Sequence, residues 1–182
     1  MESLVGQSAG VELTTVPLPS GKQVAVRTIE VSFARATPDR LRAGVLASTY
    51  TTKPLVSVGG DAMFGELAIV RTLERDGWDA VWVDTFHGRA FWNAMPHRSR
   101  PVELPPHAER RYAAIVAANG GRAGGFFDVL AWRDDQFAHL EYKGAGDRSN
   151  RNERGWIEAA LAAGVQAAEL WFVRQPRSRD AW

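Results

Sequence analysis

Two predicted strands and the turn between them fill residues 126–143, whose sequence is FFDVLAWRDDQFAHLEYK. The first strand, Phe126 to Arg133, is apolar on both faces, which is typical of a strand inside a sheet. The second, Phe137 to Lys143, follows a polar turn at Asp134-Asp135. This pattern predicts an antiparallel hairpin, and the rest of the fold can be placed around it.

Two carboxylates and a lysine interrupt the strands of this hairpin. Asp128 lies in the first strand, where Asp is poorly suited, and Glu141 and Lys143 project from one face of the second. If the turn is centred on Asp134-Asp135, Asp128 faces Glu141 directly. Facing side chains have Cβ atoms roughly 4.5 to 5.5 Å apart, and like charges at that separation are destabilising. A divalent cation shared by the two carboxylates would remove the repulsion.

The nature of that cation follows from the available ligands. The chain has no cysteine, so a thiolate zinc site, a disulfide and a cysteine nucleophile are excluded. Two carboxylates, the backbone carbonyl of Tyr142 and several waters suit Mg²⁺. Two alternatives need no metal: one carboxylate is protonated, or Lys143 pairs with Glu141.

A further carboxylate is predicted on a helix upstream. Residues Ala62 to Asp76 have helical periodicity, with Asp61 as the expected N-cap and Gly77 as the residue that ends the helix. On a helical wheel Glu66 falls in the middle of the apolar arc. A carboxylate that faces the core is costly unless it is paired, protonated or bound to a cation. The alternative is a first-turn Glu that turns to solvent and favours the helix dipole.

The remaining elements predict an α/β sandwich around a mixed sheet. They are a strand at Trp78 to Asp84, a helix at Pro106 to Asn119, a helix at Arg151 to Ala163 capped by Asn150 and stopped by Gly164, and a strand at Ala167 to Arg174. We expect residues 59–182 to form this core. Residues 1–58, with β-rich runs at Gln23 to Phe33 and Gly44 to Thr51, form an N-terminal extension of unknown role.

Asp128 followed by Glu141-Tyr142-Lys143 resembles the motif of the PD-(D/E)xK nuclease superfamily. With Gly125 to Leu130, Asp147 and Arg154-Gly155-Trp156, the chain is most similar to the VRR-NUC branch, over about Gly60 to Arg174. The resemblance implies a restriction-endonuclease-like core and metal-assisted hydrolysis of phosphodiesters.

By this resemblance Asp128 and Glu141 would be metal ligands, and Glu66 would complete the acidic cluster. Lys143 would activate the attacking water and steady the phosphate. Two positions depart from the family pattern: Phe127 stands where Pro is usual, and Glu153 where VRR-NUC members commonly have Gln. Glu153 fits a capping box with Asn150, and alternatively it extends the acidic cluster.

Basic residues and a histidine lie near this motif. Arg148, Arg151 and Arg154 flank the start of a helix, where exposed N–H groups favour anions, so they are candidate nucleic-acid contacts; solvated surface arginines are the alternative. His139 shares a face with Glu141, and we expect it to fill space in the strand rather than to ligate a metal.

These observations predict a Mg²⁺- or Mn²⁺-dependent endonuclease that acts on DNA, with RNA left open as a substrate. The alternative is a nuclease-fold module that binds nucleic acid or assembles with partner proteins without efficient catalysis. A homodimer remains open by analogy with related folds. The net charge is only +1, and no apolar run approaches the roughly 20 residues that span a bilayer, so we expect a cytoplasmic protein with no membrane partner.

Overall fold

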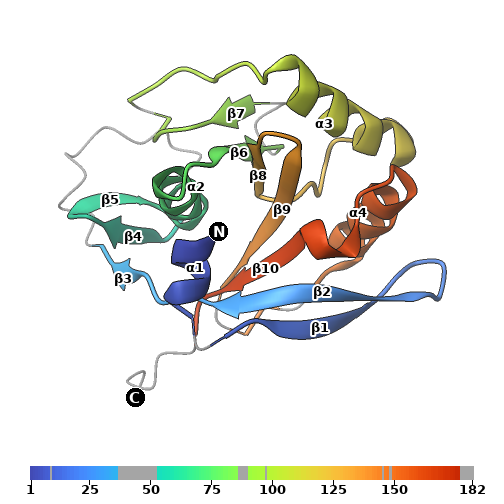
Figure 1. Ribbon diagram of the computed structural model, residues 1–182, viewed down its shortest axis with the longest axis horizontal. Helices are drawn as coiled ribbons and strands as arrows, with labels where there is room; N and C mark the ends of the chain where they lie inside the picture. The colour runs from blue at the N-terminus through green and yellow to red at the C-terminus, as the bar shows by residue number, and fades with distance from the viewer. Residues whose placement is uncertain are drawn as a thin grey trace.

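A seven-stranded mixed sheet forms the centre of the protein in a computed structural model, which describes residues 1–8, 10–36, 53–85, 90–96, 98–144, 146–147 and 149–176 (Figure 1). Its strands lie in the order β1 (Glu12–Pro17), β2 (Gln23–Glu30), β10 (Leu170–Arg174), β9 (Gln136–Lys143), β8 (Val129–Arg133), β6 (Asp79–Asp84) and β7 (Ala90–Trp92). β10 is parallel to β2 and β9, and the other neighbours are antiparallel. The prediction of an α/β fold around a mixed sheet is confirmed.

Helices cover both faces of this sheet. α1 (Glu2–Gly6) and α2 (Gly65–Arg75) pack into one hydrophobic core, and α3 (Pro106–Ala118) and α4 (Arg151–Ala162) belong to the other. The strands between them alternate strictly, with Leu140 of β9 in the first core and Leu130 of β8 in the second. A small antiparallel sheet of β3 (Ala34–Arg35), β4 (Leu55–Val58) and β5 (Asp61–Phe64) adjoins α2 (Figure 1).

The hairpin of β8 and β9 has the predicted register. Val129 pairs with Leu140, and the turn consists of Asp134 and Asp135, with Asp134 at a φ of 53°. β8 begins at Val129, however, and not at Phe126 as the sequence predicts. The reason lies just before it: Phe126 and Phe127 are buried in the α3–α4 core, so these residues leave the ladder to pack.

The predicted start of the first long helix is wrong. Asp61 is not an N-cap, because residues 61–64 form β5, and α2 begins only at Gly65 after Phe64, which provides no side-chain cap. Ala62 and Met63 are paired with β4 and buried, so tertiary contacts override the local helical periodicity. The helix ends where predicted, with Gly77 at a φ of 75°.

Other predicted elements appear with small shifts. Residues Ala167–Glu169 form a 3₁₀ turn, so β10 starts three residues after the predicted strand start. In the N-terminal region β2 lies beside β10, which joins β1 and β2 to the central sheet. The strand predicted at Gly44 to Thr51 lies outside the described residues.

Candidate metal and phosphate site

Asp128 sits at the end of the β8–β9 ladder, next to the strand that carries Glu141. Its carboxylate accepts a hydrogen bond from the N–H of Tyr142 at 2.9 Å. Its own carbonyl accepts from the N–H of Val83, so the backbone at Asp128 is held by β6 on the other side. The predicted ladder pair of Asp128 with Glu141 is therefore not formed: the ladder stops at Val129 and Leu140, and the Asp128 side chain meets the backbone of Tyr142 at the end of β9 instead.

Glu141 and Lys143 lie on one face of β9 and are both buried, at 8% and 4% exposure. The Lys143 ammonium donates to the Glu141 carboxylate at 3.2 Å, so the ion pair that the sequence left open as an alternative is present. The same ammonium lies 2.5 Å from the carboxylate of Glu153 on α4. Lys143 therefore bridges two carboxylates from different elements.

Glu153 forms the capping box that the sequence predicts and also pairs with Lys143. It closes a capping box with Asn150: the Glu153 N–H donates to the Asn150 side chain at 3.0 Å, and the Asn150 N–H donates to the Glu153 side chain at 3.1 Å. Because one carboxylate oxygen also meets Lys143, the cap connects the start of α4 to the candidate site.

Glu66 faces inward, as the helical wheel predicts, and is 5% exposed. It reaches the site because the start of α2 packs closely on β9. A Cβ added at Gly65 would lie 2.3 Å from the Tyr142 ring, so only glycine permits this approach. Glycine at the first residue of α2 therefore brings the neighbouring Glu66 toward Tyr142 and Asp128.

Lys53 is a site residue that sequence reasoning missed. Its ammonium pairs with Glu66 at 2.6 Å and lies 4.6 Å from the centre of the Trp82 ring and 5.5 Å from that of Phe64. No local pattern marks it, because it precedes β4 and reaches α2 through the tertiary fold. A buried Glu on an apolar helix face was the one available signal that a cation must lie nearby.

The carboxylates oppose one another electrostatically. Burial raises the pKa of Asp128, the charge of Glu66 raises it further, and together these outweigh the effects of Lys53, the Tyr142 N–H and Lys143, so that the pKa is about 7. Burial and the charge of Asp128 likewise raise the pKa of Glu141 well above its usual value, although Lys143 opposes this. Asp128 is therefore coupled to carboxylates on both α2 and β9.

Lys143 remains a cation in this environment. Burial alone would lower the pKa of its ammonium, but the attractions of Glu141 and Glu153 outweigh burial and raise the pKa. At neutral pH the site thus contains a fixed positive charge beside carboxylates that resist ionisation.

The donor set fits a hard divalent cation. Glu66 Oε2 is buried and has no hydrogen-bond partner among the residues that the structure describes, so this carboxylate oxygen can serve as a ligand. The N–H and C=O of one residue leave an extended strand on the same side, so the Tyr142 carbonyl is directed to the side of Asp128. Within the described residues no three Asp, Glu or His side chains form a ready-made metal cage. A bound cation would compete with Lys53 and Lys143 for these carboxylates.

The predicted phosphate-binding arginines differ in their placement. Arg151 begins α4 and is exposed, Arg154 lies one turn later and is half-buried, and Arg148 lies outside the described residues. Ahead of them the Gly144 N–H donates to Asp147 at 3.0 Å, which closes the turn after β9. Arg151 and Arg154 therefore share a helix with Glu153, beside Lys143.

His139 fills space in the α3–α4 core. It is fully buried, its ring lies 5.8 Å from that of Phe127 and 6.3 Å from that of Phe126, and neither ring nitrogen has a partner among the described residues. Burial, with a smaller effect from Arg111, lowers its pKa to about 3, so the imidazole is neutral.

No helix in the described part of the chain is long and apolar enough to cross a membrane. Comparisons with protein-family models, with curated proteins and with solved structures gave no match.

Proposed function

We propose that the protein is a metal-dependent nuclease with a restriction-endonuclease-like core, acting on DNA with Mg²⁺ or Mn²⁺. One observation carries the proposal: Asp128, just before β8, interacts with Glu66 of α2 and with Glu141 of β9 in a region where burial and mutual repulsion raise the pKa of Asp128 and of Glu141. Burial of carboxylates that repel one another costs folding free energy, and carboxylates with perturbed pKa values concentrate at functional sites.

The chain supplies a role for each residue. Glu66, Asp128, Glu141 and the Tyr142 carbonyl would hold the cation. A divalent cation held there would polarise a phosphoryl oxygen and lower the pKa of bound water. Lys143 keeps its proton and presents a positive charge beside Glu141, where it stabilises negative charge that develops on the phosphate. To do so the Lys143 ammonium would release Glu153 and contact the phosphate instead. Glu153 would remain held by its hydrogen bonds with Asn150.

A second function has its own support. The 2.5 Å contact between Lys143 and Glu153 places a negative charge where a phosphate would approach, and this favours a nuclease-fold module that binds nucleic acid, or assembles with protein partners, without efficient cleavage. A protein that only binds would use arginines such as Arg151 and Arg154 and would not need the ammonium of Lys143.

Lys143→Ala separates the two functions. In a nuclease the change lowers cleavage of DNA by about two orders of magnitude, since one preorganised charge at the transition state is worth about 3 kcal/mol. Mn²⁺ affinity, measured by isothermal titration, stays the same or increases, because a competing cation has been removed. Lys143→Met, which retains the side-chain bulk, should show the same loss, and Lys22→Ala, at an exposed turn, should show none.

The comparison of wild type with the Lys143 variants requires that wild-type protein cleaves a nucleic acid. If saturating Mn²⁺ supports no cleavage of single-stranded, duplex or branched DNA, nor of RNA, while the protein binds them, the nuclease is refuted and the binding module is supported.

A further inference from the structure

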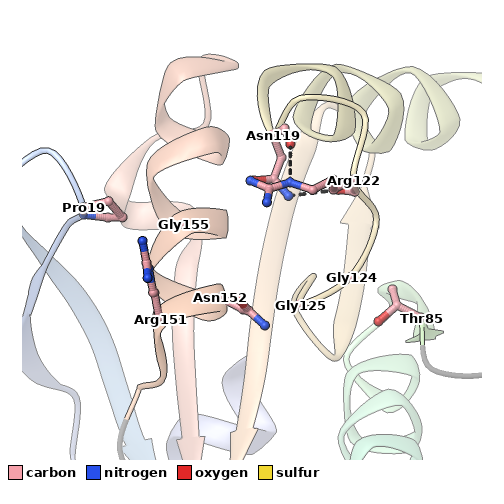
Figure 2. A pocket seen from close by; sticks show the side chains of 9 residues that line it. All are labelled: Pro19, Thr85, Asn119, Arg122, Gly124, Gly125, Arg151, Asn152 and Gly155. Carbon is pink, nitrogen blue, oxygen red and sulfur yellow. Dashed lines mark hydrogen bonds between the residues drawn. The ribbon is translucent and has the colours of Figure 1, made fainter.

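A pocket of about 770 Å³ lies over α4, and none of the four proposed catalytic residues lines it. Figure 2 shows α4, with Gly155, between Arg151 and Pro19 on one side and Arg122 and Asn119 on the other. The segments that meet here are the β1–β2 turn, α4, the loop that follows α3 and Thr85 directly after β6. The pocket has the size of a small-ligand site.

The lining is cationic and polar. Arg122 extends from its loop toward α4, and Arg151 stands on the far side of the same helix (Figure 2). None of the nine described residues that line the pocket is acidic, and none is aromatic. Two guanidinium groups without a lining carboxylate favour a phosphate, and the lack of aromatic rings gives no platform on which a base could stack.

Hydrogen bonds hold the walls in place. The Asn119 side chain donates to the Arg122 carbonyl at 2.9 Å, and the Arg122 Nε donates back to the Asn119 carbonyl at 3.4 Å. The Trp156 indole donates to the Gly124 carbonyl, which ties the loop to α4. The positively charged wall at Arg122 is therefore ordered before any ligand arrives.

The pocket adjoins the carboxylate site along the chain. Gly125 precedes Asp128 by three residues, so their Cα atoms are at most about 11 Å apart. On α4, Asn152 directly precedes Glu153, the partner of Lys143. Since successive phosphates of a strand in B-form DNA are about 3.4 Å apart along the axis, a strand at the carboxylates reaches the pocket within a few nucleotides.

We propose that this pocket binds the sugar-phosphate backbone of a single DNA strand next to the scissile phosphate, with backbone phosphates held at Arg122 and at Arg151 on the two sides of α4. This inference rests on the proposed nuclease function and specifies its substrate as DNA with a single-stranded segment. A pocket of this size admits one strand, and its lining recognises charge, so binding is independent of sequence.

Gly155 allows a direct test, because a Cβ there meets no atom within 4 Å. Gly155→Leu puts a side chain into the pocket without a clash at Cβ, and Gly155→Ala leaves most of the space open. Arg122→Gln removes one wall charge, and Arg110→Gln removes an exposed charge from α3 away from the pocket. Circular dichroism and thermal unfolding of each variant check the fold.

Binding is measured by fluorescence anisotropy of labelled oligothymidine and of a blunt duplex in EDTA, where no metal-dependent cleavage occurs. Arg122→Gln should weaken oligothymidine binding at least about tenfold, as expected for loss of a charged hydrogen bond, and Gly155→Leu should weaken it by a similar factor because its side chain occupies the pocket. Arg122→Gln should also reduce the slope of log affinity against log salt concentration by about 0.7, the value for one phosphate of a single strand. Gly155→Ala and Arg110→Gln should change the affinity for oligothymidine by less than about twofold. The affinity for the duplex should change by less than about twofold in every variant.

The outcomes distinguish failure of the pocket proposal from failure of the nuclease proposal. If wild-type protein cleaves DNA with Mn²⁺ but both pocket variants bind oligothymidine normally, the pocket proposal is overturned and the nuclease stands. An equal loss with Arg110→Gln also overturns it. If wild-type protein cleaves nothing but the pocket variants lose binding, the pocket is supported and the nuclease is refuted. Absence of oligothymidine binding by wild-type protein overturns the pocket proposal.

Discussion

Replacement of Asp128 by Asn tests the carboxylate site through protein stability, without reliance on catalysis. Asn keeps an acceptor for the Tyr142 N–H but cannot ionise. In the folded protein the pKa of Asp128 is raised from about 3.8 to about 7. Between these values the folded state binds a proton that the unfolded state has released. The stability contributed by this group is therefore fully present below about pH 4 and is lost as the pH rises through about 7.

The magnitude follows from the pKa difference. A change of one in pKa corresponds to about 1.4 kcal/mol, so the ionised Asp128 destabilises the metal-free protein at pH 8 by on the order of 2 to 4 kcal/mol. Asp128→Asn should remove this cost. Relative to wild type, the variant should gain free energy of unfolding as the pH rises from 4 to 8.

The assay is urea denaturation in EDTA across this pH range, with Asp135→Asn at an exposed turn position as the matched control. Saturating Mn²⁺ should then stabilise wild type and not Asp128→Asn, by about 2.7 kcal/mol at one hundred times the Kd. Parallel pH curves for wild type and Asp128→Asn would refute the reasoning, because they would mean that Asp128 ionises as freely when folded as when unfolded. DNA cleavage should be lost in the same variant.

Three further substitutions test the surroundings of the site. His139→Leu should flatten the loss of stability on acidification: the folded pKa is lowered to about 3, so wild type loses up to about 1.4 kcal/mol per pH unit as the pH falls from about 6.5 toward 3, measurable by urea denaturation. Gly65→Ala should cost about 1 to 3 kcal/mol and reduce cleavage, because its Cβ would lie 2.3 Å from the Tyr142 ring. Lys53→Met should tighten Mn²⁺ binding on the order of tenfold in isothermal titration, because an ammonium that competes for Glu66 is removed.

Each of these three substitutions has a result that would contradict its prediction. An unchanged acid slope in His139→Leu would mean that the imidazole is protonated in the folded state. Gly155→Ala is the matched glycine control, since it meets open space within a helix and should not destabilise. Equal stability of Gly65→Ala and wild type would contradict the close packing of α2 on β9. Weaker Mn²⁺ binding in Lys53→Met would show that Lys53 helps to organise the ligands and does not compete with the metal.

Much of the central hairpin and its neighbouring helices could be predicted from sequence. The two-residue turn fixes the register of Val129 with Leu140, and strand alternation puts Glu141 and Lys143 on one face. Asn150 with Glu153 specifies a helix start, and Gly77 a helix end. These signals act between residues that are close in the chain, where backbone geometry alone relates their positions.

Only the tertiary structure decided what meets at the site and beside it. Lys53 pairs with Glu66 across β4 and β5, Gly65 lets α2 approach Tyr142, and Arg122 faces α4 across a pocket. Residues 61–64 form a strand despite their helical periodicity, since pairing with β4 buries them. Contacts of this kind depend on how separate elements pack, and local sequence periodicity carries no information about which distant residue fills the neighbouring space.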